Sequence, residues 1–147
     1  MTAEEKIKVL FLCTGNSCRS QIAEAWLRSL GDDRFGVFSA GLEPHGINPY
    51  TITVMEETGY DMTEHRSKDL DDYKGKIDFN FLIAVCSNAD ERCPYFPGVG
   101  TRLHWPFEDP AAFVGSEDQK LAFFREIRDQ IKEKIRTWLD QNLIPNN

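Results

Sequence analysis

An apolar run that leads straight into a polar, glycine-containing loop limits this chain to few folds. Residues 7–12 are mostly apolar, and the sequence C-T-G-N-S-C-R-S follows at residues 13–20. The apolar run predicts a buried strand, and the residues from position 20 onward predict a helix. The loop between them would lie at a helix N-terminus, where unpaired N–H groups and the helix dipole favour a bound anion.

The side chains of this loop suit a tetrahedral oxyanion. Gly15 and Asn16 tolerate left-handed backbone, so successive N–H groups can point inward. The planar guanidinium of Arg19 can bind two oxyanion oxygens at once. A hydrogen bond from Ser20 to the sulfur of Cys13, together with the positive potential, favours the nucleophilic thiolate.

The alternative is a buried cysteine in a strand-to-helix turn, with Arg19 on the surface. The position of the loop between a strand and a helix argues against it. We therefore predict that Cys13 is a nucleophile. The predicted oxyanion-binding loop comprises Thr14, Gly15, Asn16, Ser17, Cys18, Arg19 and Ser20.

Strands and helices are expected to alternate along the whole chain. Hydrophobic periodicity predicts strands at residues 7–12, 35–40, 79–86 and 101–105, and helices at 20–30, 48–58 and 117–142. A polar segment at 63–74 predicts a short helix with loops. This alternation predicts an α/β fold in which residues 1–147 form a single domain. Its open, mostly parallel four-stranded sheet would carry helices on both faces, wound as in flavodoxin, with ligands at the carboxyl ends of the strands.

Composition and charge exclude several classes of function. The 147 residues carry a net charge of −7, which argues against a general nucleic-acid-binding protein. No signal peptide is expected in the acidic start, and no apolar run is long enough for a membrane span, so we expect a cytoplasmic protein. A monomer is the default expectation. Thiols are normally reduced there, so the four cysteines suggest catalysis, redox cycling or metal binding rather than structural disulfides.

The segment C-S-N-A-D-E-R-C-P at residues 86–94 holds two of these cysteines. In a helix, Cys86 and Cys93 would lie on one face with an axial separation of about 10 Å. A disulfide needs Cα atoms within about 7 Å, so the pair can bridge only if the segment unwinds, which predicts a redox switch. Pro94 would leave the end of this helix weakly anchored. Two alternatives stay open: a small strand residue with a surface thiol, or a metal site, although close C-x2-C pairs are absent.

The loop H-W-P-F-E-D-P at residues 104–110 supplies a candidate acid. Pro110 holds Asp109 in an extended or turn conformation, and a carboxyl group that faces an oxyanion site can protonate a departing oxygen. The alternative is an Asx turn or a helix N-cap, which the sequence alone favours. Structural or surface positions are expected for His45, His65, His104 and Glu108.

These motifs together make the chain similar to the thioredoxin-coupled arsenate reductases, which are built on the low-molecular-weight protein tyrosine phosphatase fold. The matching segments are V-L-F-L-C-T-G-N-S-C-R-S-Q-I-A-E-A-W at 9–26, S-A-G at 39–41, the paired cysteines at 86–94 and H-W-P-F-E-D-P-A at 104–111. The phosphatase branch lacks the paired cysteines and typically has aromatic residues where this chain has Ala111 and Ala112. Both departures favour the reductase.

The resemblance implies a mechanism for arsenic detoxification. Arsenate would bind the loop and Arg19, the Cys13 thiolate would attack arsenic, and Asp109 would protonate the departing oxygen. Cys86 would then attack the sulfur of Cys13, so that arsenite leaves, and Cys93 would attack Cys86. The redox-active Cys86–Cys93 disulfide would be reduced by thioredoxin, with a glutaredoxin–glutathione system as the alternative donor.

Some relatives bind a potassium ion near the loop, and no covalently bound cofactor is implied. By motif match the potassium ligands here would be Asn16, Glu24, Ser39 and Asp69, where K-D-L-D-D-Y departs from the usual pattern around the aspartate. Cys18 lies in the loop, but the cycle does not require it. We expect it to be structural or incidental.

Two other classes of function stay open. A low-molecular-weight protein tyrosine phosphatase would need Cys13, Arg19 and Asp109 but not the later cysteines. A thiol redox sensor or adaptor would respond to oxidant through the paired cysteines without turning over arsenate. Replacement of Cys93 by serine would separate the reductase from the phosphatase.

Overall fold

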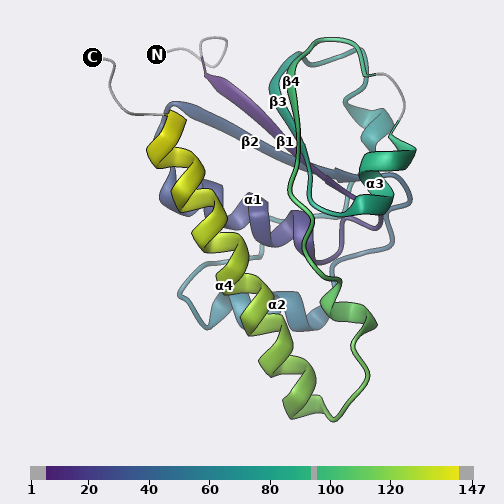
Figure 1. Cartoon of the computed structure of the whole chain (residues 1–147), viewed down its shortest axis with the longest axis vertical. Helices are drawn as coiled ribbons and strands as arrows, with labels where there is room; N and C mark the ends of the chain where they lie inside the picture. The colour runs from purple at the N-terminus through teal and green to yellow at the C-terminus, as the bar shows by residue number, and fades with distance from the viewer. Residues whose placement is uncertain (1–5, 94–95, 143–147) are drawn as a thin grey trace.

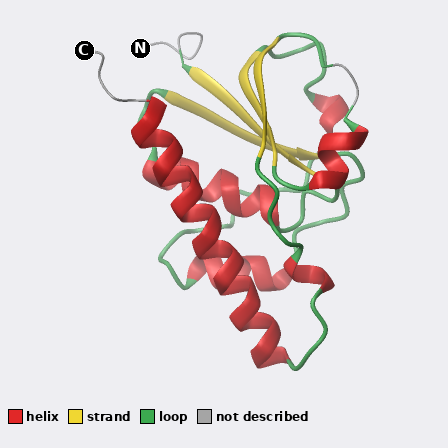
Figure 2. Cartoon of the chain, viewed as in Figure 1, coloured by secondary structure: helices red, strands yellow, loops and turns green. Residues whose placement is uncertain are grey.

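Four strands form one parallel sheet in a computed structural model that describes residues 6–93 and 96–142. The strand order is β2-β1-β3-β4, so the order reverses between β1 and β3 (Figures 1 and 2). The strands are β1 (Ile7–Cys13), β2 (Phe35–Gly41), β3 (Phe79–Ala84) and β4 (Val99–His104). The expected four-stranded parallel α/β sheet is confirmed, and its switch point lies beside the loop that follows β1.

The helices also follow the predicted pattern. They are α1 (Arg19–Leu30), α2 (Pro49–Glu56), α3 (Ser87–Arg92) and α4 (Glu117–Asn142), with 3-10 helices at Leu70–Asp72 and Pro110–Ala112. The third strand ends two residues earlier than predicted, because Cys86 already caps α3. Asn48 caps α2 by accepting a hydrogen bond from the Tyr50 N–H, as the Asn-Pro pair predicts.

The first and last helices cover one face of the sheet, with α1 packed against both β1 and α4 (Figure 1). The predicted apolar stripe of α4 is buried at Ile127, Ile131 and Ile135. Near the end of α4, Trp138 contacts the rings of Phe35, Phe81 and Trp105, which lie in or directly after three different strands. These contacts hold the C-terminal end of α4 against the sheet, while the rest of the helix packs on α1 and α2.

The opposite face is covered by the segment that precedes β3. Tyr73 packs edge-on against Phe38 of β2 and Phe79 of β3. An isolated bridge between Gly41 and Asp69 ties the same segment to the end of β2. The segment is therefore held close to the loop that follows β1.

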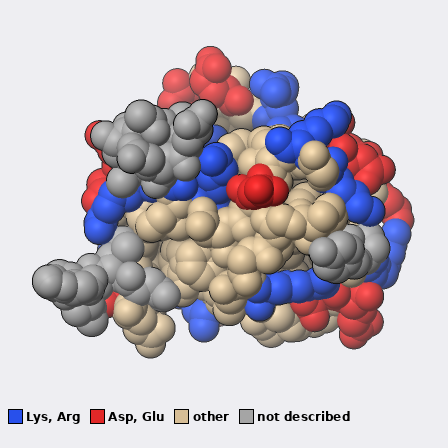
Figure 3. All heavy atoms as spheres, turned by 90° about the horizontal axis from the view of Figure 1, so that it is seen from above, with Lys and Arg blue, Asp and Glu red and all other residues tan. Residues whose placement is uncertain are grey.

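The surface carries charges of both signs. Seen from above, Lys, Arg, Asp and Glu side chains surround a central region that is mostly uncharged (Figure 3). Within residues 6–93 and 96–142, no helix combines the length and apolar character that a membrane crossing needs. Because the net charge of the chain is −7, an anion can bind only where positive charge is concentrated locally.

The last residue of β2 leaves no room for a side chain. A Cβ atom on Gly41 would lie 2.8 Å from the backbone nitrogen of Asn16 and 2.8 Å from the backbone oxygen of Thr14. These atoms belong to the loop after β1 and cannot move as a flexible side chain can. The strand thus sets the position of the loop by close backbone contact.

Replacement of Gly41 by alanine should displace this loop. We expect Gly41→Ala to lower the free energy of unfolding by about 1–3 kcal/mol, because the new methyl group overpacks against backbone. Urea denaturation measures the loss, and titration with phosphate measures anion binding, which should weaken in parallel. Gly36→Ala in the same strand is the matched control, because its nearest neighbour would lie at an ordinary 3.6 Å. Equal stability of the two variants would contradict the expectation.

Candidate functional site

A pocket of about 380 Å³ opens at the carboxyl end of β1, next to the switch point of the sheet. It brings together the loop after β1, the loop after β2, the start of α3 and the loop after β4. Its lining residues are Cys13, Thr14, Gly15, Ser17, Cys18, Arg19, His45, Asn48, Asn88, Asp109 and Ala111. Most of the predicted loop residues therefore face one cavity, together with the candidate acid.

The shape of the loop is held by a buried asparagine. Asn16 has a φ of 48°, the left-handed conformation that the sequence predicted there. Its side-chain amide donates to Ser20 Oγ at 2.7 Å and to Ser39 Oγ at 3.0 Å. Its side-chain oxygen accepts from the Lys68 backbone N–H at 2.7 Å and from Gln21 Nε2 at 3.0 Å. The loop conformation is thus fixed from the protein interior rather than by a ligand.

Cys13 is buried and lines the pocket. Its sulfur is 2.8 Å from Ser20 Oγ, as expected from the spacing of the two residues. When Cys13 is a thiolate, the Ser20 hydroxyl must donate this bond, which stabilises the anion. Asn16 donates to the same hydroxyl oxygen, so the serine hydrogen is free to point at sulfur.

Arg19 and Asp109 form an ion pair in the lining of the pocket. The Arg19 guanidinium donates to the Phe107 carbonyl at 2.9 Å and lies 3.8 Å from Asp109 Oδ2. The other carboxylate oxygen of Asp109 accepts from the Ala111 N–H and caps a 3-10 helix. Asp109 was predicted to be either the acid or the cap of a turn, and the two roles are compatible. One oxygen caps the turn while the other points toward the guanidinium.

The second cysteine is tied to the same loop. Cys86 accepts a hydrogen bond from the Ala89 N–H and thereby caps α3, and its sulfur lies 3.6 Å from Thr14 Oγ1. Asn88 donates to the Thr14 hydroxyl at 2.7 Å. The start of α3 is thus anchored to the residue that follows Cys13.

The third cysteine lies at the other end of α3, which is intact. Because Cys86 and Cys93 flank this helix, the rise of about 1.5 Å per residue keeps them apart, as predicted. Burial raises the pKa of the Cys93 thiol, and the nearby Arg102 guanidinium opposes this effect. Arg102 also donates to the carbonyls of Asp90 and Cys93. Pro94, which was expected to weaken this end of the helix, lies outside the described residues.

The fourth cysteine is chemically quiet. Burial raises the pKa of Cys18 to about 11, although its hydrogen bonds with Thr51 and Ser17 act in the opposite direction. A thiol with such a pKa stays protonated at neutral pH and is a poor nucleophile. This agrees with the expectation that Cys18 is structural.

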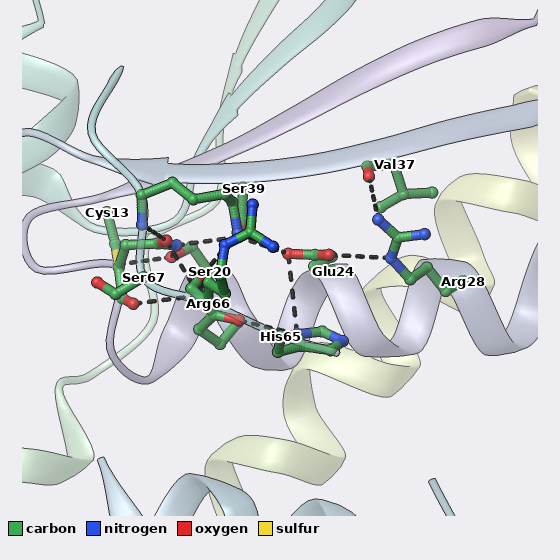
Figure 4. A network of polar contacts seen from close by, with 12 residues as sticks. Cys13, Ser20, Glu24, Arg28, Val37, Ser39, His65, Arg66 and Ser67 are labelled. Carbon is green, nitrogen blue, oxygen red and sulfur yellow. Dashed lines mark hydrogen bonds and ion pairs between the residues drawn. The ribbon is translucent and has the colours of Figure 1, made fainter. Parts of the chain in front are cut away.

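The residues expected to hold potassium are only partly assembled. Ser39 donates to Glu24 at 2.6 Å (Figure 4). The Asn16 amide donates to Ser39, so these three residues form one buried network. The carboxylate of Asp69 instead accepts from the Asp71 N–H and caps the 3-10 helix at Leu70–Asp72. Lys68 enters the network in its place, 3.7 Å from Glu24 Oε1. This donor set does not fit a potassium ion.

Lys68 and the adjoining His65 have shifted pKa values. Burial lowers the pKa of Lys68 and of His65, and the Glu24 carboxylate opposes both effects. Within residues 6–93 and 96–142, no three His, Cys, Asp or Glu side chains are grouped so that they could hold a metal ion.

Sequence reasoning missed three residues around the site. His45 lies over Gly15 so closely that any side chain on the glycine would collide with the imidazole ring. Asn88 bonds to the loop from α3, and Lys68 enters the network behind the loop. The position of His45 could have been suspected from Gly15, because a glycine in the loop lets another side chain approach the backbone closely. No local signal pointed to the other two.

Comparison with known proteins agrees with this geometry. The sequence profile described as "Low molecular weight phosphotyrosine protein phosphatase" matches residues 8–146. An arsenate reductase of Bacillus licheniformis is 42% identical over 135 residues, covering 92% of this chain and 96% of that protein. A solved structure described as an arsenate reductase in the phosphate binding state has a TM-score of 0.77 at 32% identity, covering 91% of this chain and 97% of that chain. The thioredoxin-dependent arsenate reductase of Corynebacterium glutamicum has a TM-score of 0.64 at 27% identity, over 92% of this chain and 63% of that chain.

The matched region includes the loop after β1, both ends of α3 and the Asp109 loop. The similarity is thus spread over the sheet and the pocket rather than confined to one motif. The resemblance inferred from the motifs is confirmed. The chain belongs to the low molecular weight phosphotyrosine protein phosphatase family, with arsenate reductases among its relatives there.

Proposed function

We propose that this chain reduces arsenate to arsenite by a relay of three cysteines. One observation carries the proposal: the Cys86 sulfur lies 3.6 Å from the hydroxyl of Thr14, the residue next to the nucleophile Cys13. A phosphatase needs a thiol only at the oxyanion loop. A second thiol fixed beside that loop is what a reductase needs to remove the first from a covalent intermediate.

The first step forms a bond between sulfur and arsenic. Backbone N–H groups of the loop and the Arg19 guanidinium bind the arsenate oxygens, and the Cys13 thiolate attacks arsenic. The departing oxygen takes a proton from Asp109 and leaves as water. Arsenic keeps its oxidation state in this step, because one oxygen ligand is exchanged for sulfur.

The second step transfers two electrons. The Cys86 thiolate attacks the sulfur of Cys13, a disulfide forms, and the sulfur–arsenic bond breaks. Its electron pair goes to arsenic, which leaves as arsenite. The N–H of Ala89, which hydrogen-bonds to the Cys86 sulfur, and the N-terminus of α3 stabilise the attacking thiolate.

The third step needs movement of α3. Cys93 attacks the sulfur of Cys86 and frees Cys13, but an intact helix keeps the two ends too far apart for a bond. Unwinding exposes the Cys93 thiol to water, which removes the burial that raises its pKa. The helix has six residues, so few hydrogen bonds must break.

The resulting Cys86–Cys93 disulfide requires an external dithiol. We propose thioredoxin as the donor, supported by the thioredoxin-dependent reductase of Corynebacterium glutamicum among the similar structures. A glutaredoxin–glutathione system is the alternative. The reaction belongs in the cytoplasm, because a cycle that starts from three thiols needs a reducing compartment.

Hydrolysis of phosphate esters is a second candidate activity. The loop, Arg19 and Asp109 are arranged around one pocket and would bind a phosphate group as they bind arsenate. This activity would not need Cys86 or Cys93. It is compatible with arsenate reduction in the same pocket, since phosphate and arsenate have the same shape and charge.

A single turnover tests the relay without any choice of electron donor. Fully reduced protein is mixed with arsenate alone, the thiols are blocked by alkylation, and the peptides are mapped by mass spectrometry. We expect one arsenite per protein and a disulfide between Cys86 and Cys93 that forms only with arsenate. Four alkylated thiols in protein that still binds phosphate would contradict reduction and favour the phosphatase. A disulfide that forms equally with peroxide and without arsenate turnover would favour the redox sensor.

Loss of the last thiol should stop the cycle after one turnover. In Cys93→Ser, steady-state arsenate reduction should fall by about 10³-fold or more, because the disulfide between Cys13 and Cys86 cannot be resolved. Arsenite release coupled to thioredoxin oxidation measures the loss. Hydrolysis of an aryl phosphate by the same variant is the internal control and should persist, whereas Cys13→Ser should abolish both reactions.

Loss of the acid should slow the first step. Asp109→Asn is expected to lower the rate of arsenate reduction by about 10²-fold, since an amide cannot donate the proton that the departing oxygen needs. Rapid-quench measurement of the first turnover reports this step directly. Glu108→Gln is the matched control, because that carboxyl group is exposed and does not line the pocket. Comparable losses in both variants would assign the effect to surface charge rather than to proton transfer.

A further inference from the structure

The network behind the oxyanion loop contains a cation supplied by the chain itself. The ammonium group of Lys68 lies 3.7 Å from Glu24 Oε1 and 3.4 Å from Ser39 Oγ, and it donates to the Arg66 carbonyl at 2.6 Å. Only 15% of the Lys68 side chain is exposed. A carboxylate, a hydroxyl and a backbone carbonyl thus surround one positive charge, which is the ligand chemistry that a hard metal cation would also use.

This network already carries more positive than negative charge. Glu24 is buried, and its second oxygen accepts from Arg28 Nε at 2.9 Å (Figure 4). Two cations therefore share one carboxylate, while His65 approaches the same group from another side at 3.9 Å. A further monovalent cation would be repelled by the two that are present. Asp69 does not relieve this excess, because its carboxylate caps a 3-10 helix.

The same lysine is linked to the reactive sulfur by a short chain of hydrogen bonds. Its ammonium group donates to Ser39 Oγ, and its backbone N–H donates to the side-chain oxygen of Asn16. The Asn16 amide donates to both Ser39 and Ser20, and Ser20 contacts the Cys13 sulfur. The loss of the Lys68 ammonium group would thus be transmitted to Cys13 through the side chains of Ser39, Asn16 and Ser20.

We propose that Lys68 takes the place of a potassium ion in this chain and that the oxyanion loop is consequently independent of potassium. Lys68 is a positioning residue: it holds Glu24, Ser39 and Asn16 in the arrangement that shapes the loop and does not touch the substrate. Removal of its ammonium group should leave a site that a potassium ion can occupy, lined by the carboxylate of Glu24, the hydroxyl of Ser39 and the carbonyl of Arg66. The inference goes beyond arsenate reduction and applies equally if the loop serves a phosphatase.

The experiment compares the wild-type chain with Lys68→Met in potassium chloride and in choline chloride of equal ionic strength. Thermal unfolding and the pH profile of Cys13 alkylation by iodoacetamide are the two readouts, and neither requires arsenate turnover. A failure of the proposed reductase activity would therefore leave both readouts intact. Lys76→Met, at an exposed position on the same segment, is the matched control.

The wild-type chain and Lys76→Met should give the same results in both salts. In choline chloride, Lys68→Met should unfold about 5–10 °C lower, because the buried Glu24 loses one of its partners. Its alkylation profile should shift to higher pH, with an alkylation rate about tenfold lower at neutral pH. Potassium chloride should restore most of both losses.

Three results would overturn the proposal. The first is a wild-type chain that is stabilised, or whose Cys13 becomes more reactive, in potassium relative to choline. This result alone decides against the inference even where Lys68→Met does not fold. The second is a Lys68→Met variant that equals the wild-type chain in choline chloride. The third is a loss in Lys68→Met that potassium does not restore, because the lysine would then act by packing rather than as a cation.

Discussion

The site depends on the buried amide of Asn16. A left-handed conformation at a residue other than glycine raises the free energy of the loop. The hydrogen bonds of the Asn16 side chain to Ser20, Ser39, Lys68 and Gln21 offset that cost. Because these partners come from α1, β2 and the segment before β3, the loop is preorganised before an anion enters. Preorganised N–H donors stabilise charge in the transition state without further rearrangement.

The rigidity of the loop contrasts with the short helix beside it. The six-residue α3 has a thiol at each end, Cys86 and Cys93, and its exposed side is held by an ion pair between Arg92 and Glu43. Exposed ion pairs contribute little free energy, so such a helix can unwind at small cost. A fixed oxyanion site and a movable disulfide partner are what the relay requires. The fold places the loop and α3 after the neighbouring strands β1 and β3, where the proposed relay would use them.

Positive charge is concentrated at the site, although the chain as a whole is acidic. The chain has a net charge of −7, yet cations gather where an anion must bind or where a carboxylate is buried. Arg19 and the N-terminus of α1 face the pocket, while Arg28 and Lys68 neutralise Glu24 behind it. Because only 14% of the Arg19 side chain and 15% of the Lys68 side chain are exposed, the fields of these two groups act more strongly than those of the exposed acidic residues. An acidic protein can thus bind an oxyanion.

Local patterns in the chain were enough to predict the strands to within two residues of their ends, the strand-to-helix loop with its left-handed Asn16, and the separation of the paired cysteines. Hydrophobic periodicity and the stereochemistry of glycine and asparagine act over a few residues, so they can be read without a fold. The double role of Asp109 and the contacts of Asn88 and Lys68 could not be predicted in this way. Asn88 meets Thr14 across 74 residues, and Lys68 meets Asn16 across 52. Such contacts arise only when packed strands and helices bring distant segments together, and no short-range pattern encodes which polar side chains will then meet.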